Sequence, residues 1–164
     1  MKKILFVFLL AFGCFFGANA QQNYKSAIGL RLGYPLSVSY KQFISEPGAI
    51  EVFAGFRSWT YVSFFNVGGF YQHHFASPSV EGLDWYVGGG ASAYFWSYKN
   101  LYAGDGSAST NFAVLGDIGL DYKFANAPVN ISADWAPGFF VGGDAYYTGF
   151  VGGFGSLAVR YTLK

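Results

Sequence analysis

Nine charged side chains stand out because each one alternates with apolar neighbours along a strand-like segment. Basic and acidic members of this set nearly balance. If all of them face the inside of a sheet structure, carboxylates and cations pair there, whereas the same groups separated by water would carry ions or protons. The set consists of Arg31, Lys41, Arg57, Lys123 and Arg160 together with Glu51, Asp117, Asp121 and Asp134.

Two adjacent histidines, His73 and His74, are the other candidates for chemistry. Consecutive residues of a strand point to opposite faces, so the two rings cannot share a metal ion. His73 with a serine of the segment 77–79 is the nearest approach to a catalytic pair, and no G-x-S-x-G motif accompanies it. The glycine runs 68–69 and 88–90 precede no helical pattern, so they do not resemble phosphate-binding loops. We therefore expect no catalytic residue, no metal ligand and no cofactor.

The charged residues lie on segments that alternate apolar with small or polar residues, which is the pattern of β-strands. The last segment shows it most clearly, since Val159, Tyr161 and Leu163 share one face and Arg160 lies on the other. Turn signals such as the Glu-Pro-Gly sequence at 46–48 separate the segments. The pattern predicts eight strands, the last closing onto the first as an antiparallel barrel: 25–34, 37–45, 49–57, 62–75, 84–96, 111–124, 129–136 and 149–164.

The composition of the two strand faces indicates that this barrel lies in a membrane. One face is apolar, and the opposite face carries mostly Gly, Ala and Ser with sparse charges. A secreted soluble β-sandwich or lipocalin-like barrel is the alternative, but its outward face would be rich in Lys, Glu and Thr. An apolar surface of this extent meets lipid, so the sequence predicts an all-β, antiparallel transmembrane β-barrel.

The lengths of the connections give the predicted barrel a direction. Long loops on the outer side and short turns on the periplasmic side are typical of barrels in the outer membrane of a Gram-negative bacterium. We expect the outer loops at 34–37, 58–61, 97–110 and 137–148, and the periplasmic turns at 46–48, 76–83 and 125–128. Four tryptophans near the strand ends are then expected to form an interfacial aromatic girdle. They are Trp59, Trp96 and Trp135 at the outer end and Trp85 at the inner end.

The first twenty residues have the pattern of a secretory signal peptide. Two lysines precede an apolar run that ends in the small-x-small sequence at 18–20. The run is short of the ~20 apolar residues of a membrane anchor, and the bulky Phe12 argues against lipoprotein processing at Cys14. The sequence therefore divides into a signal peptide at 1–20, removed after Sec-type export, and one cysteine-free barrel domain at 21–164.

Much of the chain resembles a known family, the small outer-membrane β-barrel proteins of the Bacteroidetes type. The resemblance implies a signal peptide followed by an eight-stranded barrel broadly like the transmembrane domain of OmpA or OmpX. It transfers no functional residue, because most members have no assigned activity. One departure is the C-terminus, where Leu163 and Lys164 replace the usual final aromatic residue, with Tyr161 nearby. The stretches that carry the resemblance are IGLRLGYP, KQFISEPGAIEVFAGFR, EGLDWYVGGGASAYF, GLDYKFANAPVNISADWAP and GSLAVRYTLK.

We expect an integral outer-membrane barrel of structural or surface-interaction type. The interior of an eight-stranded barrel is only wide enough for side chains, so the nine charges are expected to form a network that fills the lumen. A narrow pore for small ions or solutes is the alternative, and a lipid A-modifying barrel enzyme is the second alternative. The expected partners are outer-membrane lipid, lipopolysaccharide and the outer-membrane assembly machinery. Without the leader the chain has eight basic and nine acidic residues, which gives no reason to expect nucleic acid, and no extracellular ligand is indicated.

Overall fold

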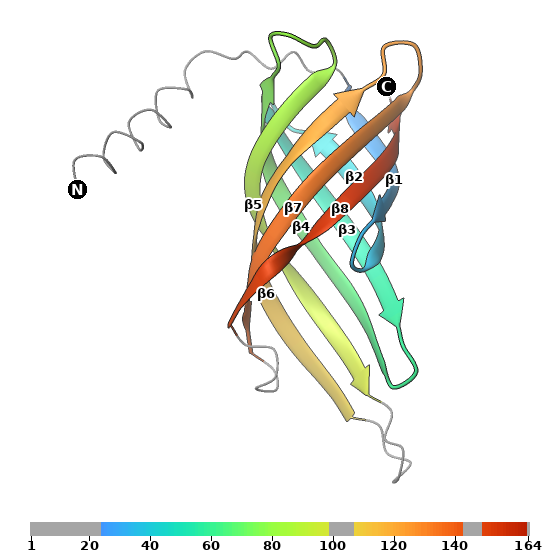
Figure 1. Cartoon of the computed structure of the whole chain (residues 1–164), viewed down its shortest axis with the longest axis vertical. Helices are drawn as coiled ribbons and strands as arrows, with labels where there is room; N and C mark the ends of the chain where they lie inside the picture. Colours follow the sequence, from blue (N-terminus) through green and yellow to red (C-terminus); the bar gives the residue numbers. More distant parts are fainter. Residues whose placement is uncertain (1–23, 99–106, 143–148, 164) are drawn as a thin grey trace, which may run out of the picture.

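A computed structural model describes residues 24–98, 107–142 and 149–163 of the chain. Within these residues the chain forms a closed barrel in which each strand pairs antiparallel with its neighbours in sequence (Figure 1). The strands are β1 (Ser26–Leu32), β2 (Leu36–Phe43), β3 (Gly48–Ser58), β4 (Val62–Ala76), β5 (Leu83–Tyr98), β6 (Ser107–Lys123), β7 (Val129–Val141) and β8 (Gly149–Leu163).

Pairing between the first and last strands closes the barrel. Residues 26–32 of β1 pair in continuous antiparallel register with residues 157–163 of β8. This pairing satisfies the backbone groups that an open edge would expose, which a sheet surrounded by lipid requires. The prediction of an eight-stranded antiparallel barrel closed by the last segment is confirmed.

The strands differ from the predicted ones mainly at their ends. β5 continues to Tyr98 and β6 begins at Ser107, so the loop predicted at 97–110 shrinks to 99–106, which lies outside the described residues. β7 continues through Pro137, where its pairing with β8 has a register shift between Ala136 and Gly138. A proline lacks the amide hydrogen that a regular ladder needs, and such an irregularity accommodates it. The remainder of the loop predicted at 137–148 includes residues 143–148, outside the described part.

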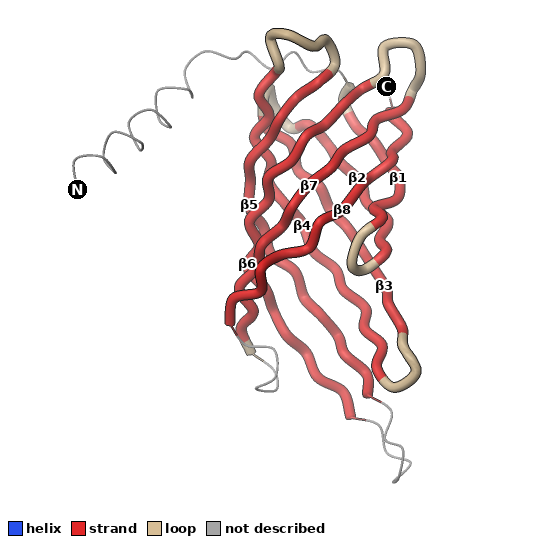
Figure 2. Tube along the Cα trace, viewed as in Figure 1, coloured by secondary structure: helices blue, strands red, loops and turns tan. Residues whose placement is uncertain are grey.

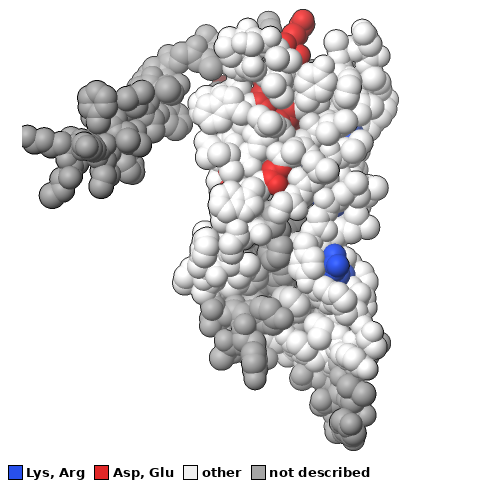
Figure 3. Space-filling view, viewed as in Figure 1, with Lys and Arg blue, Asp and Glu red and all other residues white. Residues whose placement is uncertain are grey.

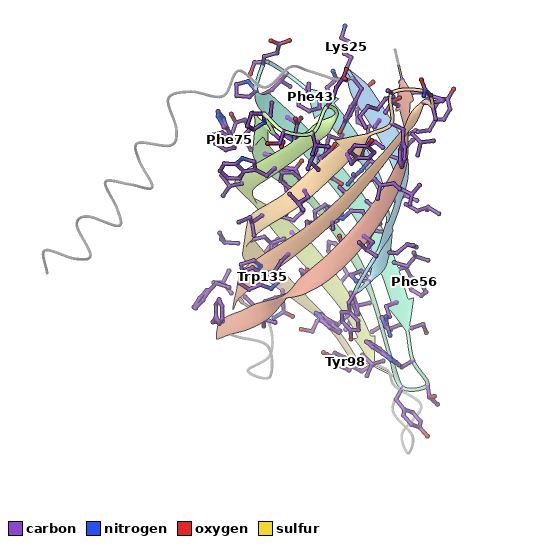
Figure 4. The ribbon with its side chains drawn as sticks, turned by 45° about the horizontal axis from the view of Figure 1, so that its top comes forward. Lys25, Phe43, Phe56, Phe75, Tyr98 and Trp135 are labelled. Atoms are coloured by element: carbon purple, nitrogen blue, oxygen red, sulfur yellow. The ribbon has the colours of Figure 1, made fainter. Side chains whose placement is uncertain are left out.

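Alternation along each strand separates an apolar exterior from a mixed interior. The outward residues Ile28, Val67 and Leu120 are exposed, and Phe56 and Trp135 project from the outer surface of the ribbon (Figure 4). On the face drawn in Figure 3, uncharged side chains cover most of the described surface, with few acidic or basic groups. A surface with so many exposed large apolar side chains meets lipid, so the strands span a membrane.

The two ends of the barrel differ, and we name them by their connections. The turn end carries the short connections 44–47, 77–82 and 124–128, and both ends of the described chain lie there (Figure 2). The loop end carries the connections 33–35 and 59–61, and β5, β6, β7 and β8 also meet their longer connections there. β5 and β6 extend furthest at the loop end, so the rim of the barrel is slanted (Figure 1). In Figure 4, Lys25 and Phe43 mark the turn end and Tyr98 marks the loop end.

The predicted signal peptide at 1–20 and its Cys14 lie outside the described residues. In the part of the chain that the structure describes, no helix is long and apolar enough to cross a membrane.

Two equally exposed valines provide a test of the lipid-facing surface. Val67 lies outward in the middle of β4 and Val80 lies in the turn after it, and each exposes 45% of its surface. We expect Val67→Arg to lower the free energy of unfolding in lipid vesicles by about 2–4 kcal/mol, because an arginine at membrane depth loses its water. Val80→Arg, beyond the strands, should change it little. Urea unfolding followed by tryptophan fluorescence measures both, and equal tolerance of the two variants would show that water covers the outer face.

Candidate functional site

Glu51 is the centre of a cluster of charges in the lumen. β3 places it inward, opposite Lys41 of β2. One carboxylate oxygen accepts hydrogen bonds from Arg31 at 3.2 Å and from Arg160 at 2.5 Å, and the other lies 3.9 Å from Lys41 Nζ. The Glu51 side chain is fully buried, so these three cations replace its hydration.

Asp121 of β6 pairs with the third cation of the cluster. Its Oδ2 lies 2.8 Å from Lys41 Nζ and accepts a hydrogen bond from the Tyr24 hydroxyl at 3.0 Å. The other oxygen accepts a hydrogen bond from the Asn130 side chain. The Lys41 ammonium also lies 4.6 Å from the centre of the Tyr86 ring, a cation–π distance. Both charges therefore have direct partners in place of water.

Asp134 of β7 binds the terminal nitrogen of Arg31 that does not contact Glu51. Arg31 Nη2 donates to Asp134 at 2.7 Å and to the Ser156 hydroxyl at 3.0 Å. Ser156 in turn donates to Asp134 at 2.7 Å, and the Tyr86 hydroxyl donates to its second oxygen at 3.2 Å. Arg31 thus bridges two carboxylates that come from different strands.

Arg160 of β8 is held by neutral groups as well as by Glu51. Its Nε donates to the Ser39 hydroxyl at 3.0 Å. Its Nη1 donates to the Ser132 hydroxyl at 2.7 Å and to the side-chain amide oxygen of Asn130 at 3.4 Å. These contacts fix the plane of the guanidinium while Nη2 donates to Glu51.

These paired residues form a continuous charged layer, which we call the ionic plug. It contains three cations and three carboxylates, each contributed by a different strand, so it extends across the lumen. Removing one partner from a buried pair typically costs on the order of 3–5 kcal/mol, because the other charge is left without water or a counterion. The ionic plug consists of Arg31, Lys41, Glu51, Asp121, Asp134 and Arg160.

Asp117 lies beside the ionic plug but has a neutral partner. Gln72 Nε2 donates to Asp117 at 2.6 Å and to the second oxygen of Glu51 at 3.0 Å. Gly88 stands between Gln72 and Asp117 in the register, and a Cβ there would lie 1.9 Å from the Tyr71 carbonyl oxygen. The absence of a side chain at Gly88 lets the amide of Gln72 reach across to Asp117. Within the described residues, no cation lies within ion-pair distance of Asp117, whose other oxygen accepts no hydrogen bond there.

Two of the nine residues predicted for the lumen network lie elsewhere. Arg57 is on the inward face of β3 but at the loop end, where its guanidinium lies 4.3 Å from the ring centre of Tyr34 and 4.9 Å from that of Trp59. Lys123 lies at the turn end and donates to the backbone carbonyls of Phe124 and Ala127 at 2.5 and 2.7 Å. Both side chains lie on the inward faces of their strands, as predicted, but they are closer to the two ends of the barrel than the residues of the plug are. The prediction that they belong to the network is wrong.

The neutral members of the site were not identified from the sequence. Alternation places Gln72, Ser39 and Ser132 on inward faces. Amides and hydroxyls are common on any polar strand face, so their residue types alone do not indicate a function. Tyr24 precedes β1, where no strand pattern locates its side chain. The signal that could have found Gln72 is its inward position beside strands that carry Glu51 and Asp117.

The two histidines point to opposite faces, as strand geometry requires. His74 is buried between the rings of Phe43 and Tyr86, with centroid distances of 4.8 and 5.0 Å, and its Nδ1 lies 3.6 Å from Asp84. His73 packs on Phe75 at 4.8 Å. Neither ring forms a hydrogen bond with a serine of the 77–79 turn among the described residues. In the same part of the chain, no group of three or more His, Cys, Asp or Glu side chains is placed to hold a metal ion.

The tryptophans of the predicted aromatic girdle occupy two different environments. Trp85 and Trp135 are exposed on the outer surface, and for them the girdle stays a prediction. Trp96 exposes only 7% of its surface and packs against Phe64 inside the barrel, so its assignment to the girdle is wrong. Trp59 follows β3 at the loop end, where it packs against Tyr34 and Phe64 and still exposes 42% of its surface, so its place in the girdle also stays a prediction.

Aromatic residues fill the part of the lumen between the ionic plug and the loop end. Their rings form a cluster that leaves an open space of about 740 Å³, which we call the aromatic cavity. The described part of the lumen therefore has a charged layer, the ionic plug, and an aromatic part toward the loop end. The rings that matter most for the shape of the cavity are those of Tyr34, Trp59, Phe64, Tyr94, Trp96 and Phe140.

Comparison with known proteins identifies the fold but no family. No family model and no curated protein matches the sequence. The crystal structure of neisserial surface protein A (NspA) matches with a TM-score of 0.59 at 15% sequence identity, covering 84% of this chain and 93% of that one. The N-terminal β-barrel domain of Pseudomonas aeruginosa OprF matches with a TM-score of 0.56 at 17% identity, covering 84% and 94%. At these identities the similarity shows the fold, an eight-stranded barrel of the outer-membrane kind.

Two isosteric substitutions separate the paired aspartates from the unpaired one. We expect Asp121→Asn to lower the free energy of unfolding by about 3–5 kcal/mol, because it leaves the buried Lys41 ammonium without its nearest carboxylate. Asp117→Asn should be neutral or stabilising, because it removes a buried charge that has no cation and keeps an oxygen for Gln72. Urea unfolding in lipid vesicles measures both. A larger loss in the Asp117 variant than in the Asp121 variant would contradict this assignment of partners.

Proposed function

We propose that this protein is an integral outer-membrane β-barrel of structural or surface-interaction type whose lumen is closed by side chains. The observation that carries the proposal is the ionic plug. The side chains of Lys41, Glu51 and Arg160 have no exposed surface, and their partners lie in direct contact with them. Direct contacts of this kind across the lumen support closure by side chains, as expected for an eight-stranded barrel.

The proposed location is the outer membrane of a Gram-negative bacterium, reached after Sec-type export. The apolar outer surface and the similarity in fold to NspA and the OprF barrel support it. In the proposed orientation the loop end faces the exterior and the turn end the periplasm, because outer-membrane barrels place short turns inside. Outer-membrane lipid, lipopolysaccharide and the assembly machinery are the proposed partners, and the Bacteroidetes-type barrels are the proposed relatives.

A narrow pore would use the same residues in a different arrangement. Charges that line a water-filled passage are separated by solvent, whereas Arg160 and Glu51 lie 2.5 Å apart and Lys41 and Asp121 lie 2.8 Å apart. These contacts favour a closed lumen over a pore.

Conductance in a planar bilayer tests whether the lumen is closed. We expect little or no steady single-channel current from the unaltered protein. Arg160→Ala should produce transient openings and lower the free energy of unfolding by about 3–5 kcal/mol, because Glu51 loses its closest cation. Arg57→Ala is the matched control, since it removes an inward arginine that lies between the plug and the loop end. It should change neither the current nor the free energy of unfolding appreciably.

A steady, ion-selective current from the unaltered protein would overturn the closed lumen and favour the pore. The same conclusion would follow if Arg160→Ala and Arg57→Ala had equal effects on current and on unfolding.

Single cysteines at the two ends test the proposed orientation. Thr60 at the loop end and Asn126 at the turn end are both exposed, and the chain after residue 20 has no other cysteine. On intact cells, a membrane-impermeant maleimide should label Thr60→Cys and spare Asn126→Cys until the outer membrane is opened. Labelling of Asn126→Cys alone on intact cells would mean that the barrel has the opposite orientation.

A further inference from the structure

The aromatic cavity has the size and lining of a small-molecule site. Its volume of about 740 Å³ lies within the ~300–1,000 Å³ range of ligand pockets, which are mostly apolar with a few polar groups. It opens at the loop end and is lined by residues of the inward faces of several strands and of the 59–61 loop. The ionic plug does not use these residues, so their arrangement needs another explanation.

The walls of the cavity are built mainly from rigid aromatic rings rather than from flexible aliphatic chains. Phe64 packs on Trp96 with ring centroids 4.5 Å apart, and Tyr94 packs on Phe140 at 4.9 Å. The rings of Tyr94 and Trp96 are nearly parallel, with 18° between their planes. Rings packed on one another in this way give the cavity rigid apolar walls, which suit a flat, unsaturated group better than a bent aliphatic chain.

Arg57 provides a positive charge next to this cavity. Its guanidinium lies over the rings of Tyr34 and Trp59, which both line the cavity. Among the described residues, Arg57 has no ion-pair partner, and none of the described lining residues is acidic. Stacking on two rings fixes the plane of the guanidinium, and no described residue supplies a counterion for its charge, an arrangement suited to a carboxylate ligand.

The floor of the cavity limits how deep a ligand can lie. A separate, narrower space of about 50 Å³ shares Tyr34 and Tyr94 with the cavity and is also lined by Asn66 and Arg31. It has room for ordered water and not for an aromatic ring. The buried amide oxygen of Asn66 accepts no hydrogen bond from the described residues, so it can hold such a water. A bound ligand would therefore remain on the loop-end side of Arg31, and Arg31 would stay paired in the ionic plug.

We infer that the aromatic cavity binds a small planar aromatic anion, with its ring among the aromatic side chains that line the cavity and its carboxylate on Arg57. This inference goes beyond the proposed function and does not depend on whether the lumen conducts. Its chemistry is that of an arene carboxylate, which combines a flat apolar body with one negative charge at the edge.

Calorimetric titration of the barrel in lipid nanodiscs tests the inference. Nanodiscs avoid detergent chains, which would compete for an apolar cavity, and empty nanodiscs provide the blank. The probes are 2-naphthoate and 2-naphthamide, which have nearly the same shape and differ in charge. We expect naphthoate to bind about tenfold more tightly than naphthamide, because a charge-assisted hydrogen bond to Arg57 is formed only by the carboxylate.

Three variants separate the charge from the cavity. Arg57→Gln should weaken naphthoate about tenfold and leave naphthamide unchanged. Lys25→Gln is the matched control, since it removes an exposed cation at the turn end and should affect neither probe. Val62→Trp fills the cavity from β4 and should abolish binding of both probes; Thr60→Trp does the same from the loop if the first variant does not fold.

The inference is overturned if the unaltered barrel binds the two probes equally, or if Arg57→Gln and Lys25→Gln have the same effect. Binding of decanoate as tight as that of naphthoate would overturn the planar part of the inference. A conducting barrel that still prefers naphthoate would overturn the closed lumen alone, so the two proposals fail separately.

Discussion

Glu51 imposes the constraint on which the rest of the lumen depends. A carboxylate without water carries a desolvation cost of several kcal/mol, and this cost is offset only when cations contact it directly. The three cations come from β1, β2 and β8, so Glu51 ties its own strand to three others. A slip of one residue in any of these strands would turn its cation toward lipid. The buried carboxylate therefore fixes the register of strands whose backbone bonds alone would tolerate alternatives.

Arg31 marks the boundary between the charged and aromatic parts of the lumen. Its guanidinium contacts Glu51 and Asp134 at its edge and lies 5.5 and 5.4 Å from the ring centres of Phe53 and Phe70. A planar cation can satisfy carboxylates in its plane and aromatic rings on its faces at once, which an ammonium group cannot do as well. The lumen can therefore pass from ion pairs to stacked rings within one side chain.

The sequence predicts much of this fold because lipid leaves few choices for an outward residue. Every second position must be apolar, so the remaining positions identify the inward face, and Glu51, Asp121 and Arg160 could be placed there from alternation alone. The position of each inward side chain along the barrel axis could not be predicted in this way. Arg57 shares the inward face of β3 with Glu51, but six residues of strand separate them by roughly 20 Å. Whether two inward groups meet depends on the tilt and stagger of whole strands, which no local pattern encodes. Trp96 shows a second limit: a tryptophan near a strand end is typical of an interfacial girdle, but Trp96 lies two residues from the inward Tyr94 on β5 and so shares its inward face.

The seam between β1 and β8 has a consequence for how the barrel is assembled. Both arginines that contact Glu51 lie on the two strands that meet at this seam. While the sheet is still open, at least one of them is separated from the carboxylate, and the interior has to retain water around an unneutralised charge. Joining the first strand to the last brings the arginines together around Glu51 and expels that water in the same event. The final step of folding thus carries a large share of the electrostatic stabilisation, and the finished cylinder is cooperative: a hairpin removed from it holds no complete set of counterions.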